Sequence, residues 1–137
     1  MEILTLKRDL PAIDDGRWVG SDEVAGLHDV RVKVRGHSAK VVRDCYAAKE
    51  RALDPADMIG AKVKPEVQNR MAVETLAEVG LVDVDGLTMD GKAITASEVK
   101  AMLPDPAFSP LIDLITAACF VVDRTRVAKS DALRGNS

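Results

Sequence analysis

Residues 29–35 restrict the possible fold more than any other stretch of this chain. Three valines alternate there with three cations: Val30, Val32 and Val34 with Arg31, Lys33 and Arg35. A period of two places the valines on one face of a β-strand and the cations on the other. Gly26 and Gly36 bracket the stretch, as turn residues do. The chain is therefore predicted to contain a sheet with one apolar face, which helices can cover.

The rest of the pattern predicts one domain of class α+β spanning residues 1–137. A small N-terminal antiparallel β-sheet or hairpin is followed by a mainly α-helical bundle. The predicted parts are a β-rich region at 1–36, a helical region at 37–82, turns and C-terminal helices at 83–128, and a flexible tail at 129–137. A chain of 137 residues is long enough for one continuous core.

Helix-start signals organise the region 37–82. Ser38 is expected to cap the first helix, whose apolar side includes Val42 and Tyr46. Asp54-Pro55 is interpreted as a helix restart, and Lys64-Pro65 as the start of the next helix. In the β-rich region, Asp14-Asp15-Gly16 is expected to be a turn before a strand at residues 17–19.

Turns and caps fill the segment 79–120. Asp83-Val84-Asp85-Gly86 and Asp90-Gly91 are interpreted as two acidic turns. Thr95 and Glu98 have the spacing of a capping box. A long apolar helix is expected over residues 111–128. It is apolar on nearly every side, which predicts a place in the core or in a subunit interface.

The charge is unevenly distributed along the chain. The net charge is −3, yet residues 31–51 are basic and residues 54–123 are acidic. Either a partner-binding surface or a solvated face fits this pattern. The predicted surface for a partner or for self-association consists of Arg31, Lys33, Arg35, Lys40, Arg43 and Met102. A small DNA-binding protein is an alternative, but the acidic balance and an aromatic content of 3% disfavour nucleic-acid binding.

No stretch of the sequence predicts catalytic, metal-binding or cofactor-binding residues. Asp83, Asp85 and Asp90 lack the glycine and glutamate positions of a calcium loop. The pair Ser97 and Lys100 matches a bare S-x-x-K, and helix-start residues explain it better. His28 and His37 are expected to lie in loops at the two ends of the strand. We therefore predict a binding protein and no enzyme.

The location follows from the apolar segments and the cysteines. Cys45 and Cys119 lie in apolar helical patterns and are expected to be free, buried thiols in a reducing compartment. The longest apolar run, residues 111–122, is short for a membrane span and contains Asp113. A cytoplasmic location without a membrane partner is predicted.

Several segments together resemble the tail assembly chaperones of long-tailed, siphophage-type bacteriophages and prophages. They are GRWVG (16–20), VRVKVRG (30–36), VDVDGL (82–87), DGKAIT (90–95), EVKAMLPDP (98–106) and LIDLITAA (111–118). The likeness covers roughly residues 16–136. One departure is Val84, where related sequences often carry an aromatic residue.

The resemblance implies a non-enzymatic assembly factor of the host cytoplasm. Its partners would be the tape measure protein, which it keeps soluble, and the tail tube protein, with self-association in addition. A structural component of the phage tail or the head-tail connector is the first alternative, and a small phage DNA-binding regulator is the second. The adaptable side chains for a helix-binding surface, or else for core filling, would be Met58, Met71, Met89 and Met102.

Overall fold

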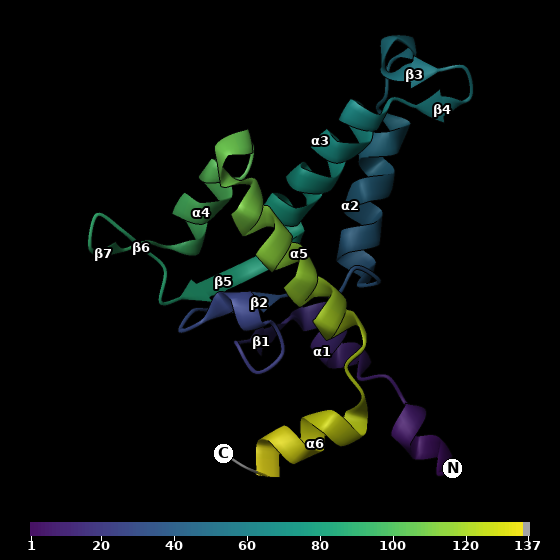
Figure 1. Ribbon diagram of the computed structural model, residues 1–137. Coiled ribbons are helices and arrows are strands. Elements are labelled where there is room, and N and C mark those ends of the chain that lie inside the picture. The colour runs from purple at the N-terminus through teal and green to yellow at the C-terminus, as the bar shows by residue number, and fades with distance from the viewer. Residues whose placement is uncertain (136–137) are drawn as a thin grey trace.

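The structure is a computed structural model, which describes residues 1–135, with side chains up to residue 131. It confirms the predicted α+β class (Figure 1). The helices are α1 (Leu10–Asp15), α2 (Lys40–Arg51), α3 (Pro65–Thr75), α4 (Ala96–Met102), α5 (Ser109–Asp123) and α6 (Val127–Gly135). The strands are β1 (Arg17–Val19), β2 (Arg31–Val34), β3 (Met58–Ile59), β4 (Lys62–Val63), β5 (Leu81–Asp85), β6 (Thr88–Met89) and β7 (Lys92–Ala93). Short helical turns are η1 (Ile3–Leu6), η2 (Ala25–Leu27), η3 (Pro55–Asp57), η4 (Leu76–Gly80, a π-helix) and η5 (Pro106–Phe108).

The predicted strand is the centre of a three-stranded antiparallel sheet in the order β1-β2-β5. Val32 and Val34 on β2 are completely buried. Their core neighbours include Ile115 and Val122 on α5, which crosses the sheet in front of β2 in Figure 1. The period-two pattern therefore predicted both the strand and its buried face.

Strand β5 corrects the prediction of an acidic turn at residues 83–85. Leu81–Asp85 pairs with β2, so that Asp85 lies opposite Arg31 and Asp83 opposite Lys33. Aspartate disfavours strands, but cross-strand pairs of opposite charge stabilise a sheet. The cations of β2 therefore explain why an acidic segment forms a strand.

The N-terminal segment corrects the prediction of β structure before residue 17. Residues 10–15 form α1, because the Asp9 carboxylate accepts a hydrogen bond from the Ala12 N–H at 3.2 Å and Pro11 suits the first turn. Gly16, with φ of 99°, then connects this helix to β1.

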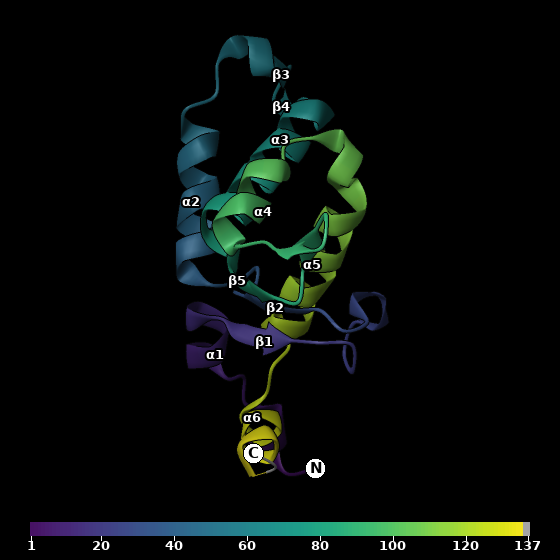
Figure 2. The ribbon, with the colours of Figure 1, turned by 90° about the vertical axis from the view of Figure 1, so that its left-hand side faces the viewer.

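Helices α2 and α3 form an antiparallel hairpin that rises from the sheet (Figures 1 and 2). The Lys49 Nζ atom of α2 lies 3.3 Å from Glu74 Oε2 and 2.8 Å from Glu78 Oε1. The helix restart predicted at Asp54-Pro55 is found, with Asp54 as cap and Pro55 at the first position, but it is confined to one turn. This single turn, η3, leads into the hairpin β3-β4 at the tip. The prediction of a helix start at Lys64-Pro65 is confirmed by α3.

The segment 86–103 confirms two of the predicted signals. Asp90 and Gly91 both have positive φ, 52° and 79°, and form the tight turn of the hairpin β6-β7. Thr95 and Glu98 form the capping box at the start of α4. Val99 and Leu103 then reach the core.

The long C-terminal helix ends earlier than predicted. Helix α5 stops at Asp123, because the chain turns at Arg124 and then pairs with the N-terminal segment, where Arg126 forms an antiparallel bridge with Arg8. The Asp9 N–H donates to the Thr125 carbonyl at 2.9 Å, and the Val127 N–H donates to the Lys7 carbonyl at 2.9 Å. Part of the predicted tail then forms α6, while residues 136–137 lie outside the described residues.

The stretch Pro106–Asp123 has the length and composition of a membrane span, with a mean hydropathy of 1.5 over 18 residues. In the structure it consists of η5 and α5, and α5 supplies Ile115, Ala118 and Cys119 to the core. Only 22% of the stretch is buried. Helix α5 therefore presents apolar surface outside the core as well as inside it.

Candidate functional site

A groove with a volume of about 640 Å³ lies between the α2-α3 hairpin and α5. Most of its lining surface is apolar, with side chains from all three helices and from η4: Val42, Tyr46, Val73, Leu76, Ile112 and Cys119. Val42 and Tyr46 are four positions apart, Val73 and Leu76 three, and Ile112 and Cys119 seven, so each pair lies on one helix face. We refer to this site as the α2-α5 groove.

Charged side chains stand at the two ends of the α2-α5 groove. Arg35 and Arg43 lie at the end near the sheet, where α2 begins. Glu50, two turns further along α2, and Asp113 on α5 lie toward the other end. The groove thus has an apolar floor, a basic end and an acidic end.

His37 lines the end of the α2-α5 groove near the sheet. Its ring packs against the ring of Phe120, with 4.2 Å between ring centroids, and its Nε2 atom is buried without a hydrogen-bond partner among the described residues. Burial lowers the pKa of His37, although the Asp123 charge and a hydrogen bond to the Thr116 backbone act in the opposite direction. The imidazole is therefore neutral at pH 7.

Acidification is expected to destabilise the protein through His37. Because the pKa of His37 is below its ordinary value of about 6.5 in the folded chain, the unfolded chain binds a proton first. The stability that the neutral ring contributes is fully present above the ordinary pKa of the unfolded chain. This stability is lost as the pH falls from the ordinary pKa through the lower pKa of the folded chain. The His37→Gln variant should show a smaller drop in thermal midpoint between pH 7.5 and pH 5.5 than the wild type. Equal drops would contradict this. The exposed His28, replaced by Asn, is the matched control.

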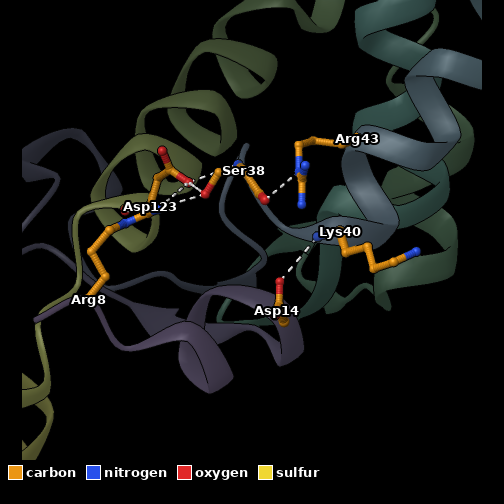
Figure 3. Close-up of polar contacts among 6 residues, drawn as sticks. All are labelled: Arg8, Asp14, Ser38, Lys40, Arg43 and Asp123. Carbon is orange, nitrogen blue, oxygen red and sulfur yellow. Dashed lines mark hydrogen bonds and ion pairs between the residues drawn. The ribbon is translucent and has the colours of Figure 1, made fainter.

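A network around Asp123 joins the end of α5 to the segment that precedes α2 (Figure 3). Asp123 Oδ1 accepts hydrogen bonds from the Ser38 N–H, at 2.8 Å, and from the Ser38 hydroxyl. Arg8 Nη2 donates to the Ser38 hydroxyl at 2.6 Å and to the Asp123 carbonyl at 3.0 Å. Burial raises the pKa of Asp123, but these bonds, the charge of Arg8 and the charge that His37 carries once it is protonated outweigh burial and hold the pKa below its usual range. We call this network the Asp123 clamp.

The Asp123 clamp corrects the prediction that Ser38 caps α2. The Ser38 side chain is bound to Asp123, and helix α2 begins after Ala39 without a capping side chain of its own. Asp14 of α1 supplies part of the missing cap, because its Oδ1 accepts from the Lys40 N–H at 3.1 Å. Asp14, which is distant in sequence, thus supplies part of the cap that was predicted for Ser38.

The six predicted surface residues do not form one patch. Arg31 and Lys33 lie on the outer face of the sheet, Lys40 points to solvent on α2, and Met102 lies on α4. Arg35 and Arg43 line the α2-α5 groove.

The contacts of the predicted cations lie within the chain. Arg31 Nη2 lies 2.8 Å from Asp85 Oδ2, and Arg31 Cζ lies 5.0 Å from the centroid of the Trp18 ring. Lys40 Nζ lies 2.7 Å from Asp44 Oδ2. Arg35 donates to the Asp14 and Val79 carbonyls at 2.9 and 2.7 Å, and Arg43 donates to the Ser38 carbonyl at 2.9 Å. Arg31, which was predicted to belong to a partner or self-association surface, is thus paired within its own chain.

Methionines do not supply the groove surface. Met71 is buried in the core and Met89 is exposed on the β6-β7 hairpin. Met58 and Met102 are half-buried outside the described lining of the groove. Sequence reasoning missed the groove itself, and the available signal was the apolar spacing of Val42 and Tyr46.

The described residues in and around the α2-α5 groove include few groups suited to metal binding or to nucleophilic attack. Within the described part of the chain, no group of three or more His, Cys, Asp or Glu side chains could hold a metal ion. Cys119 lines the groove and is free, but burial raises the pKa of its thiol to about 12. Because the thiolate is the nucleophilic form, Cys119 is a poor nucleophile at neutral pH.

Comparisons with protein-family models, with curated proteins and with solved structures found no match to this chain. The function is therefore inferred from the groove and from the sequence pattern.

Proposed function

We propose that the protein is a non-enzymatic tail assembly chaperone of a long-tailed phage or prophage, which holds amphipathic helices of the tape measure protein in the α2-α5 groove. It would act in the host cytoplasm during assembly and deliver this partner to the tail tube protein. The observation that carries the proposal is an apolar groove lined by three helices and open at the molecular surface. The sequence resemblance supplies the identity of the partner.

The shape and chemistry of the groove suit an amphipathic helix. In helix-in-groove recognition, side chains spaced by three or four residues on one helix face enter an apolar groove. Val73 and Ile112 are only partly buried and stand on opposite walls, so an apolar stripe between them would remove both from water. Arg43 and Glu50 would pair with charges that flank the stripe.

Co-expression with the tape measure protein tests this function. Ala72 is exposed and lines the groove, so Ala72→Glu places a charge there without disturbing the core. The wild type should co-purify with the tape measure protein and raise its soluble fraction, and Ala72→Glu should weaken binding by about tenfold or more, because the new carboxylate is buried on binding. Ala48→Glu, on the exposed side of α2, is the matched control.

The outcomes separate the function from the site. If the wild type neither co-purifies with nor solubilises the tape measure protein, the proposed function is wrong. If Ala72→Glu and Ala48→Glu bind equally well, the chaperone uses another surface. Mass spectrometry that finds the protein in purified particles would favour the structural alternative, and a salt-dependent shift of DNA would favour the regulator.

A further inference from the structure

The N-terminal arm, residues 1–7, carries apolar side chains that the fold does not cover. Ile3, Leu4 and Leu6 are 76%, 64% and 52% exposed, and no residue of η1 is buried. Figures 1 and 2 both show the arm beside α6, on the opposite side of the sheet from the α2-α3 hairpin. Contiguous exposed apolar side chains of this kind indicate an interaction site.

The arm is held at its base and points away from its own groove. Beyond the arm, Arg8 belongs to the Asp123 clamp, and the carbonyl of Lys7 accepts the Val127 N–H at 2.9 Å. Entry of the arm into the groove of the same chain would require these contacts to break. Docking of the arm into the groove of another copy requires no such rearrangement.

The arm and the groove match in both spacing and charge. In a 3₁₀-helix residues three apart share a side, so Ile3 and Leu6 form one apolar edge. At roughly 2 Å per residue, Glu2 and Lys7 are about 10 Å apart along the arm. Arg43 and Glu50 are two turns apart on α2, which is again about 10 Å. An arm in the groove can therefore place Glu2 at Arg43, Lys7 at Glu50, and the apolar edge on the apolar floor.

We propose that the N-terminal arm of one copy of this chain docks in the α2-α5 groove of a second copy. The contact pairs two different surfaces, the arm of one copy and the groove of the other, and each copy carries both. A partner helix that enters the groove displaces the arm. Self-association thus covers both apolar surfaces while the partner is absent.

Sedimentation of the full chain over a range of concentrations tests the proposal. The wild type should self-associate, and both the arm variant Ile3→Asp/Leu6→Asp and the groove variant Ala72→Glu should weaken association by about tenfold or more. Ile59→Asp, at an exposed position on the β3-β4 hairpin, should behave as the wild type does. An equimolar mixture of the arm and groove variants should form a heterodimer, since one intact groove and one intact arm remain.

A charge exchange tests the pairing without touching the apolar edge. Lys7→Glu and Glu50→Lys should each weaken association, and the double variant should recover it. A monomeric wild type, an arm variant that associates normally, or a mixture that forms no heterodimer would overturn the proposal. Protection of the arm from hydrogen exchange in a monomer would also overturn it, in favour of docking within one chain.

Failure here is distinguishable from failure of the proposed function. The arm variant should bind the tape measure protein at least as well as the wild type, since its groove is vacant and intact. Loss of self-association without loss of this binding supports the arm as the displaced occupant. Loss of both self-association and tape measure binding in the arm variant would contradict displacement of the arm by the partner helix.

Discussion

Replacing Asp123 by alanine is expected to lower the free energy of unfolding by about 2–3 kcal/mol, because hydrogen bonds to charged groups contribute about 1.5–3 kcal/mol. One carboxylate oxygen accepts from both the N–H and the hydroxyl of Ser38 and faces Arg8, so the substitution leaves all of these donors without their acceptor. Urea denaturation at pH 7 measures the change.

The matched control is Asp44→Ala. Asp44 Oδ2 lies 2.7 Å from Lys40 Nζ on the exposed side of α2, and ion pairs that are this exposed to solvent contribute little to stability. Since the Asp123 carboxylate must be charged to act, its contribution should be present above the ordinary aspartate pKa and lost as the pH falls through its lower folded value. Equal losses for Asp123→Ala and Asp44→Ala would show that the clamp is not stabilising.

Replacing Gly36 by alanine is expected to cost about 2–3 kcal/mol, the upper part of the range for an overpacked site. A Cβ atom there would lie 2.8 Å from Ile13 Cγ2, 2.8 Å from Asp123 Oδ1 and 3.0 Å from Asp123 Cα. The last of these is backbone, so α5 or the β2-α2 connection has to shift. Chemical denaturation gives the loss, and binding by the variant shows whether the groove is disturbed.

Gly20→Ala is the control for this substitution. A Cβ at Gly20 would meet only Arg31 Cγ and Cδ, at 3.5 and 3.9 Å, which is ordinary contact, and its φ is not positive. Its effect should lie within about 0.5 kcal/mol of zero or be slightly stabilising. A Gly36→Ala variant as stable as Gly20→Ala would mean that α1 and α5 pack less closely than described.

Local signals predicted the elements whose ends are determined by their own residues. The valine alternation at residues 30–34 became β2, the proline at 65 began α3, and Thr95 with Glu98 formed a capping box. Contacts from distant segments account for the errors. Residues 83–85 form a strand because β2 supplies the opposite charges, and α5 ends at Asp123 because the N-terminal segment pairs with residues 125–127.

The α2-α5 groove was not predictable for the same reason. Val42, Val73 and Ile112 each belong to an ordinary apolar helix face, and a sequence pattern cannot tell a face that meets a neighbour from one that borders a gap. Arg43 was selected for its charge and does line the groove, whereas Arg31 was selected on the same grounds and is bound to Asp85. His37 was expected to be a simple loop residue, and its buried Nε2 depends on Phe120, more than eighty positions away.

The two ends of the α2-α3 hairpin are attached to neighbouring strands. The chain enters it from β2 and leaves it through η4 into β5, while the tip bears only the small β3-β4 hairpin. One wall of the groove is therefore attached to the sheet at one end, beside His37 and Gly80, and is not attached to it at the other end, toward Glu50 and Asn69. A binding site built in this way can accept side chains of different size at its outer end while holding a constant width at its base.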